Sequence, residues 1–139
     1  MRKATVISPA KYQKESRYEQ IITLEDGLSF KFDALYFRTA EVWEVTFEDA
    51  QGNRYQSEKR KGAAIELFAA LEKVFNDFIA KTLPNKFRFT ADIDEKSRVK
   101  LYNTLAKKIA KKGLGYEYTT KQSPAAVIYK FKHWSVDEF

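Results

Sequence analysis

The stretch from Gly62 to Tyr116 constrains the fold of this chain more than any other, because helical and strand periods alternate within it. Apolar residues recur at steps of three and four over residues 63–82, which predicts a long amphipathic helix with one broad apolar stripe. Pro84 follows and ends that helix. The predicted stripe consists of Ala64, Leu67, Phe68, Leu71, Val74, Phe75, Phe78 and Ile79.

A short strand and a second helix come next. Phe87 and Phe89 alternate with polar residues, and this period of two predicts a strand with one buried face. A second helix is expected over residues 95–112, with Ser97 as the residue that caps its start. A return strand is then expected to begin near Tyr116.

Further strands are expected on both sides of this unit. The dipeptide Asp26-Gly27 favours a tight hairpin turn, because glycine accepts a positive φ. Leu28 opens the strand behind that turn, and the same alternation of apolar and polar residues recurs around Val45. The expected strands cover residues 21–24, 28–32, 43–47, 54–57, 87–89, 116–119 and 126–131.

This order of elements predicts one α+β domain over residues 1–139, with an N-terminal arm at 1–19 and a C-terminal tail at 133–139. The sheet is expected to be mainly antiparallel and twisted, with two helices packed on it and one β-α-β crossover, which is right-handed by default. A chain of 139 residues buries enough surface for a core without disulfides or metal.

Composition excludes several kinds of site. The chain has no cysteine, so disulfides, thiolate zinc sites and cysteine nucleophiles are excluded, and the single histidine, His133, cannot form a multi-histidine metal site. No apolar run approaches the ~20 residues that a membrane span needs, and the N-terminus does not look like a signal peptide. A cytoplasmic protein with no metal and no membrane partner is therefore expected.

Positive charge gathers on the second helix. The formal net charge is +6, and no acidic residue interrupts residues 96–112. Such a face can track a phosphate backbone, although an ordinary solvated helix face is the equal alternative. The candidate nucleic-acid-binding residues are Lys96, Arg98, Lys100, Lys107, Lys108, Lys111 and Lys112.

The order strand, basic-glycine turn, long helix, strand, second helix and return strand resembles the C-terminal half of the GNAT N-acetyltransferase fold, over roughly residues 42–132. That family binds the pyrophosphate of acyl-CoA at a glycine-containing turn that opens its long helix, where helix-start N–H groups suit phosphate. The resemblance implies acetyl-CoA as a cofactor, whereas a solvated turn is the reading from the residues alone. The matching residues are Lys59, Arg60, Lys61, Gly62, Ala63 and Ala64, with lysine in place of the family's Gln or Arg and alanine in place of its second glycine.

A tyrosine of the second helix carries the other half of this resemblance. In many GNAT enzymes a tyrosine within a Leu-Tyr-x-x-x-Gly-Phe run protonates the leaving thiolate, and Leu101-Tyr102 matches its first part. Gly115-Tyr116 comes some three turns later than the run places Gly-Phe. The resemblance implies Tyr102 as a catalytic acid, whereas its position on an apolar helix face indicates a core ring with its hydroxyl at the rim. The resemblance also implies that the strands that contain Trp43 and Phe87 splay apart to admit the cofactor.

A second resemblance runs through the same segment. A proline, a Phe-x-Phe-x-Ala strand and Ser-Arg-x-x-Leu-Tyr on a helix that ends near Gly-Tyr are similar to a group of small bacteriophage proteins of unassigned role. This resemblance implies a viral context and brings no function with it. The matching residues are Pro84, Phe87, Phe89, Ala91, Ser97, Arg98, Leu101, Tyr102, Gly115 and Tyr116.

Taken together, the sequence favours a phage-type accessory protein in the host cytoplasm that binds a macromolecule without catalysis and needs no cofactor. The partner is nucleic acid at the lysines of the second helix, or a protein at an aromatic surface. Two alternatives stay open. One is an acyl-CoA-dependent N-acetyltransferase, and the other is a virion or assembly component.

Overall fold

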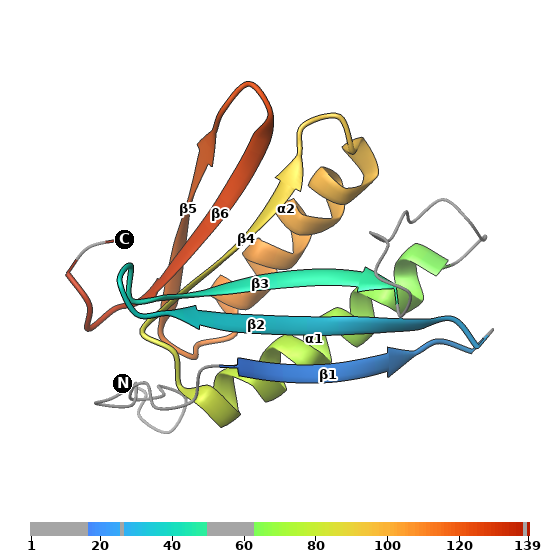
Figure 1. The fold of residues 1–139 in the computed structure, drawn as a ribbon, viewed down its shortest axis with the longest axis horizontal. Coiled ribbons are helices and arrows are strands. Elements are labelled where there is room, and N and C mark those ends of the chain that lie inside the picture. The colour runs from blue at the N-terminus through green and yellow to red at the C-terminus, as the bar shows by residue number, and fades with distance from the viewer. Residues whose placement is uncertain (1–16, 26, 50–62, 138) are drawn as a thin grey trace.

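The structure is a computed structural model that describes residues 17–25, 27–49, 63–137 and 139. These residues form one six-stranded sheet covered by two helices (Figure 1). The sheet order is β1-β2-β3-β4-β6-β5, and β3 and β4 pair in parallel while every other neighbouring pair of these strands is antiparallel. The elements are β1 Arg17–Thr23, β2 Ser29–Phe37, β3 Val42–Asp49, α1 Ala63–Thr82, β4 Lys86–Asp92, α2 Lys96–Lys111, β5 Tyr116–Gln122 and β6 Ala126–His133. The expected α+β architecture with one crossover is confirmed.

The sheet opens in its middle. β3 and β4 pair only through Trp43–Phe87, Glu44–Arg88 and Val45–Phe89. Beyond that point β3 continues beside β2 as far as Asp49, and β4 continues beside β6 as far as Asp92. The two halves of the sheet therefore diverge from a shared base, which Figure 1 shows as the widening gap between the arrows of β3 and β4.

Both helices cover the same face of the sheet. The ring of Phe89 on β4 lies 5.3 Å from Phe75 of α1 and 4.9 Å from Tyr102 of α2, between ring centroids. Phe78 of α1 is fully buried, and its ring lies 5.5 Å from that of Trp43. The predicted stripe supplies this core: Leu67, Leu71, Val74, Phe75, Phe78 and Ile79 are all buried.

The opposite face of the sheet is mostly polar, although Ile21 and Leu35 are exposed on it. Arg17 donates two hydrogen bonds to Asp33, at 3.1 and 2.9 Å, across the β1–β2 pair. Arg88 forms an ion pair at 2.9 Å with Glu44, its register partner on β3. Exposed pairs of this kind contribute little to stability, because water and salt screen them.

The structure corrects several expected boundaries. β1 begins at Arg17, inside the stretch expected as an arm, and β6 ends at His133, inside the expected tail. Both residues extend because each has a register partner: Arg17 pairs with Leu35, and His133 pairs with Tyr116. The strand expected over residues 54–57 lies outside the described residues.

Two single-residue expectations also change. Leu28 is 43% exposed, because it precedes the strand and lies in the hairpin turn instead of on the buried face. Glu95, and not Ser97, occupies the N-cap of α2, since the N–H of Val99 already donates to the carbonyl of Glu95 at 2.9 Å. Ser97 therefore lies within the first turn of the helix.

Candidate functional site

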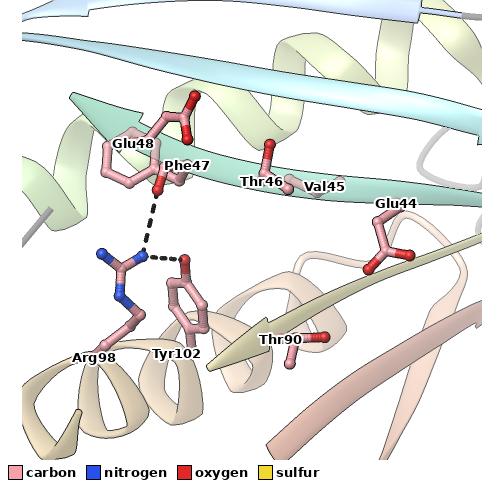
Figure 2. A pocket seen from close by; sticks show the side chains of 8 residues that line it. All are labelled: Glu44, Val45, Thr46, Phe47, Glu48, Thr90, Arg98 and Tyr102. Carbon is pink, nitrogen blue, oxygen red and sulfur yellow. Dashed lines mark hydrogen bonds between the residues drawn. The ribbon is translucent and has the colours of Figure 1, made fainter. Parts of the chain in front are cut away.

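A cleft of about 260 Å³ lies where β3 and β4 diverge. It spans the last paired residues of β3 and the divergence beyond them, and α2 closes it from below in the view of Figure 2. Strand residues form most of the wall, and two side chains of α2 complete it. The lining residues are Glu44, Val45, Thr46, Phe47, Glu48, Thr90, Arg98 and Tyr102.

The wall that β3 contributes follows from its alternating sequence. Val45 and Phe47 are buried on the side of the helices, whereas Thr46 is exposed and Glu48 half-buried on the polar side. The carbonyl of Phe47 faces the cleft, because it accepts a hydrogen bond from α2. In a strand the N–H and C=O of one residue point to the same side, so the backbone of Phe47 presents its polar edge to the cleft.

Arg98 and Tyr102 approach this edge from α2. They are four residues apart, so they lie on the same side of the helix. The guanidinium Nη1 of Arg98 donates to the hydroxyl of Tyr102 at 3.0 Å and to the carbonyl of Phe47 at 3.4 Å (Figure 2). Its Nε lies 3.5 Å from the carboxylate of Glu95. Arg98 is only 6% exposed, so the wall of the cleft contains a buried cation.

Packing fixes the ring of Tyr102. The ring makes an edge contact with Phe89 at 4.9 Å and with Tyr129 at 6.0 Å, between centroids. Tyr102 is 5% exposed, yet it lines the cleft. The expectation of a core ring with its hydroxyl at the rim is therefore confirmed, and the hydroxyl lies at the cleft.

Tyr129 of β6 lies behind Tyr102 and plays a different part. Its hydroxyl donates to Asn103 at 2.6 Å, and burial raises the pKa of Tyr129 to about 12. Tyr129 therefore stays protonated at neutral pH and supports α2 from the sheet.

The cleft also carries two carboxylates on its polar side. Glu44 is engaged by Arg88 at 2.9 Å. Glu48 also lines the cleft and makes no ion pair or hydrogen bond with any residue in the described ranges. No group of three or more His, Cys, Asp or Glu among the described residues could hold a metal ion.

The structure separates the residues that charge alone grouped together. The six lysines expected to bind nucleic acid are exposed on α2, whereas Arg98 is buried and points into the cleft. Lys59 to Gly62 lie outside the described residues, and α1 begins at Ala63. Neither described helix has the length and apolar character to cross a bilayer.

Sequence reasoning did not single out Thr46, Glu48 or the inward position of Arg98. A signal for Arg98 was present, since an α-helix turns about 100° per residue and places residue 98 roughly opposite Lys96 and Lys107. Thr46 and Glu48 carried no such signal. The alternation of polar and apolar residues around them predicts a strand, but it does not show which strand lies beside that strand in the sheet.

Known structures share this arrangement of strands and helices. A chimera of the spermidine N-acetyltransferase SpeG from Vibrio cholerae and hSSAT matches with a TM-score of 0.55 at 8% identity, and the match covers 88% of this chain and 69% of that chain. Mutant forms of the spermidine/spermine N-acetyltransferase SpeG from Vibrio cholerae match with a TM-score of 0.54, the same identity and the same coverage. The fold is GNAT-like. At this identity the likeness establishes the fold and carries no activity with it. No protein-family model matches the chain, and no curated protein matches it.

Proposed function

We propose that this chain is an acyl-CoA-dependent N-acetyltransferase whose acyl thioester enters the cleft between β3 and β4. One observation carries the proposal: pairing stops after Val45–Phe89, and the exposed strand edge beyond it faces the hydroxyl of Tyr102. The GNAT-like neighbours, which are named as spermidine N-acetyltransferases, support it. This cleft favours the acetyltransferase alternative over a binder without catalysis.

The size and chemistry of the cleft fit the acyl end of such a ligand. Its 260 Å³ is slightly below the ~300–1,000 Å³ of small-molecule sites, so it accepts the thioester end of the arm and leaves the nucleotide outside. An extended chain that contains amide groups can pair with an open strand edge, which here is the backbone at Phe47. Because Arg98 already donates to that carbonyl, a ligand at this edge shares Phe47 with the guanidinium or displaces it.

Tyr102 is the proposed proton donor. Acetyl-CoA supplies an acetyl group on a thiolate leaving group, so the reaction forms a C–N bond, breaks a C–S bond and requires a proton for the departing sulfur. The hydrogen bond from Arg98 uses the acceptor side of the Tyr102 hydroxyl. The phenolic O–H is the donor that can serve the sulfur. The neighbouring guanidinium stabilises the negative charge that Tyr102 develops as the proton leaves.

Glu48 is the proposed acceptor for the amine. An ammonium group must lose one proton before its nitrogen can attack and a second proton as the C–N bond forms. A carboxylate at the mouth of the cleft can attract the ammonium group and take one of these protons, and the other passes to water. Glu48 lies on the polar side of the cleft and is not held by another residue in the described ranges. Glu44 is less suited, because Arg88 already neutralises it.

A thiol-release assay tests this function directly. Acetyl transfer frees the thiol of CoA, and this chain contributes no background because it has no cysteine. The purified protein is incubated with acetyl-CoA and a panel of primary amines that begins with spermidine. Amine-dependent thiol release that falls about 100-fold or more in Tyr102→Phe or Glu48→Gln supports the proposal, within the range of general acid–base catalysis. Release that both variants retain in full would reject these roles.

The bacteriophage context, with a place in the host cytoplasm or in a virion, stays a prediction. It rests on the motif between Pro84 and Tyr116 alone.

A further inference from the structure

Four lysines form a stripe on the side of α2 that faces away from the core. An α-helix turns about 100° per residue, so Lys96, Lys100, Lys107 and Lys111 fall within about 60° of one another. All four are exposed, and Lys108 and Lys112 flank them. The stripe lies roughly opposite the buried residues of the helix, which are Arg98, Tyr102, Leu105, Ala106 and Ile109.

The protein does not neutralise this lysine stripe. Over the described ranges, no carboxylate lies within 4.0 Å of any of its four lysines, and only Lys112 beside it pairs, with Glu72 at 3.1 Å. Several cations elsewhere do pair. Examples are Arg17 with Asp33, Lys31 with Glu19, Lys73 with Asp77, Arg88 with Glu44 and Lys132 with Glu117. The stripe thus keeps like charges at i,i+4 spacing, which destabilises an isolated helix.

We propose that the lysine stripe binds the phosphate backbone of a duplex nucleic acid. With a rise of 1.5 Å per residue, Lys96 and Lys111 are about 22 Å apart along the helix axis. A duplex carries one negative charge per about 1.7 Å of its own axis, so all four lysines can meet phosphates at once. Contacts to phosphate alone make the binding independent of sequence and dependent on salt.

The composition of the exposed side of α2 argues against two other anionic partners, which are a membrane surface and a single-stranded nucleic acid. A helix that lies in a membrane interface inserts large apolar side chains, and proteins that hold single strands stack bases on aromatic rings. None of the exposed large hydrophobic residues among the described part of the chain belongs to α2. They are Ile21, Leu28, Leu35, Phe37, Ile65, Trp134 and Phe139.

This activity is separate from acetyl transfer. Arg98 and Tyr102 face the cleft from one side of α2, and the lysine stripe occupies the other side. A ligand in the cleft and a duplex on the stripe can therefore bind the same molecule together. Neither ligand depends on the other for its contacts with the protein.

Fluorescence anisotropy with a labelled 20-base-pair duplex DNA tests the inference. Four phosphate contacts predict that affinity falls about 100-fold between 50 and 200 mM salt. The triple variant Lys100→Gln, Lys107→Gln, Lys111→Gln should bind at least about tenfold more weakly at 50 mM salt, with a slope of log affinity against log salt shallower by about 3. The control Lys73→Gln, Lys81→Gln, Lys121→Gln makes the same change in net charge at exposed lysines elsewhere.

The control variant should stay within about threefold of the unaltered protein, because its lysines lie off the stripe. Equal losses in the two variants would overturn the inference and indicate attraction to net charge alone. No binding of duplex by the unaltered protein, tighter binding of a single strand of equal length, or binding only to vesicles that contain anionic lipid would also overturn it. Binding of acetyl-CoA should be the same in both variants. A failure to bind duplex is therefore distinguishable from a failure of the proposed acetyltransferase function.

Discussion

The Nη1 atom of Arg98 lies 3.0 Å from the hydroxyl oxygen of Tyr102 and 3.4 Å from the carbonyl oxygen of Phe47. The bond to Tyr102 lies within α2, and the bond to Phe47 joins α2 to β3 at the place where β3 no longer pairs with β4. A guanidinium removed from water needs such partners, because an unpaired buried charge is very costly. Arg98 therefore links α2 to the part of β3 that does not pair with β4, and it positions the hydroxyl that we assign to catalysis.

The coupling between Arg98 and Tyr102 is measurable as a free energy. Tyr102→Phe removes an acceptor from a buried charged donor, and we expect it to lower the free energy of unfolding by about 1–3 kcal/mol. Arg98→Met should cost at least as much, since it also leaves the carbonyl of Phe47 without this donor. Urea denaturation of both single variants and of the double variant gives the coupling. The two single losses should exceed the double loss by about 1 kcal/mol or more. Additive losses would mean that the hydrogen bond contributes nothing.

Two glycines with positive φ should respond differently to alanine. Gly115 has φ +97, and a Cβ there would lie 2.8 Å from Nε2 of His133, whose side chain is buried. Gly27 has φ +90, but nothing lies within 4 Å of its Cβ position. Gly27→Ala should cost only the backbone strain, about 1–2 kcal/mol, and Gly115→Ala should cost clearly more. Thermal unfolding of the two variants checks the order, and similar losses would show that the contact with His133 relaxes.

Stability should fall in alkaline solution through the buried tyrosines. Burial raises the pKa of Tyr129 to about 12 from an ordinary value of 10.0, and burial also raises the pKa of Tyr116. A folded-state pKa above the unfolded value stabilises the fold below pH 10, and this contribution is lost between pH 10 and about 12. The free energy of unfolding should thus decline over that window, and less steeply in Tyr129→Phe. An equal decline in the variant would assign the loss to other groups, such as lysines.

The lysine stripe should weaken the helix that carries it. The first turn of α2 has no acidic residue, so Lys96 places a positive charge near the positive end of the helix dipole. Lys96→Glu reverses that charge and forms a favourable i,i+4 pair with Lys100, and we expect a gain of about 0.5 kcal/mol in the free energy of unfolding. The gain should shrink as salt rises. Lys73→Glu, which breaks the pair with Asp77, serves as the contrasting variant and should bring no gain.

Periodicity predicted the elements of this fold well. The three- and four-residue steps of α1 identified Leu67, Leu71 and Phe78 as core, and the alternation around Phe87 and Phe89 identified β4. Both patterns are local, because one element buries one face whatever its neighbours are. The general rules of chain connection then predicted one β-α-β crossover in a mainly antiparallel sheet.

The candidate site depended on relations that no local pattern contains. The cleft exists because β3 and β4 pair through three residue pairs and then separate. This separation depends on the relative direction of two strands that are far apart in the sequence. Arg98 was grouped with the lysines by charge, although the period of the helix turns it the other way. The role that we propose for Glu48 could be separated from Glu44 only once the ion pair of Glu44 with Arg88 was known.

Isothermal titration calorimetry with acetyl-CoA tests the central claim most directly. Thr46 is exposed on β3 and lines the cleft, so Thr46→Trp should fill the opening without disturbing the core. Thr120→Trp places the same side chain on β5, at another exposed threonine outside the cleft. We predict that the unaltered protein and Thr120→Trp bind acetyl-CoA with equal affinity and that Thr46→Trp does not bind. Absence of heat from the unaltered protein at millimolar acetyl-CoA, or unchanged binding in Thr46→Trp, would contradict a cofactor site between β3 and β4.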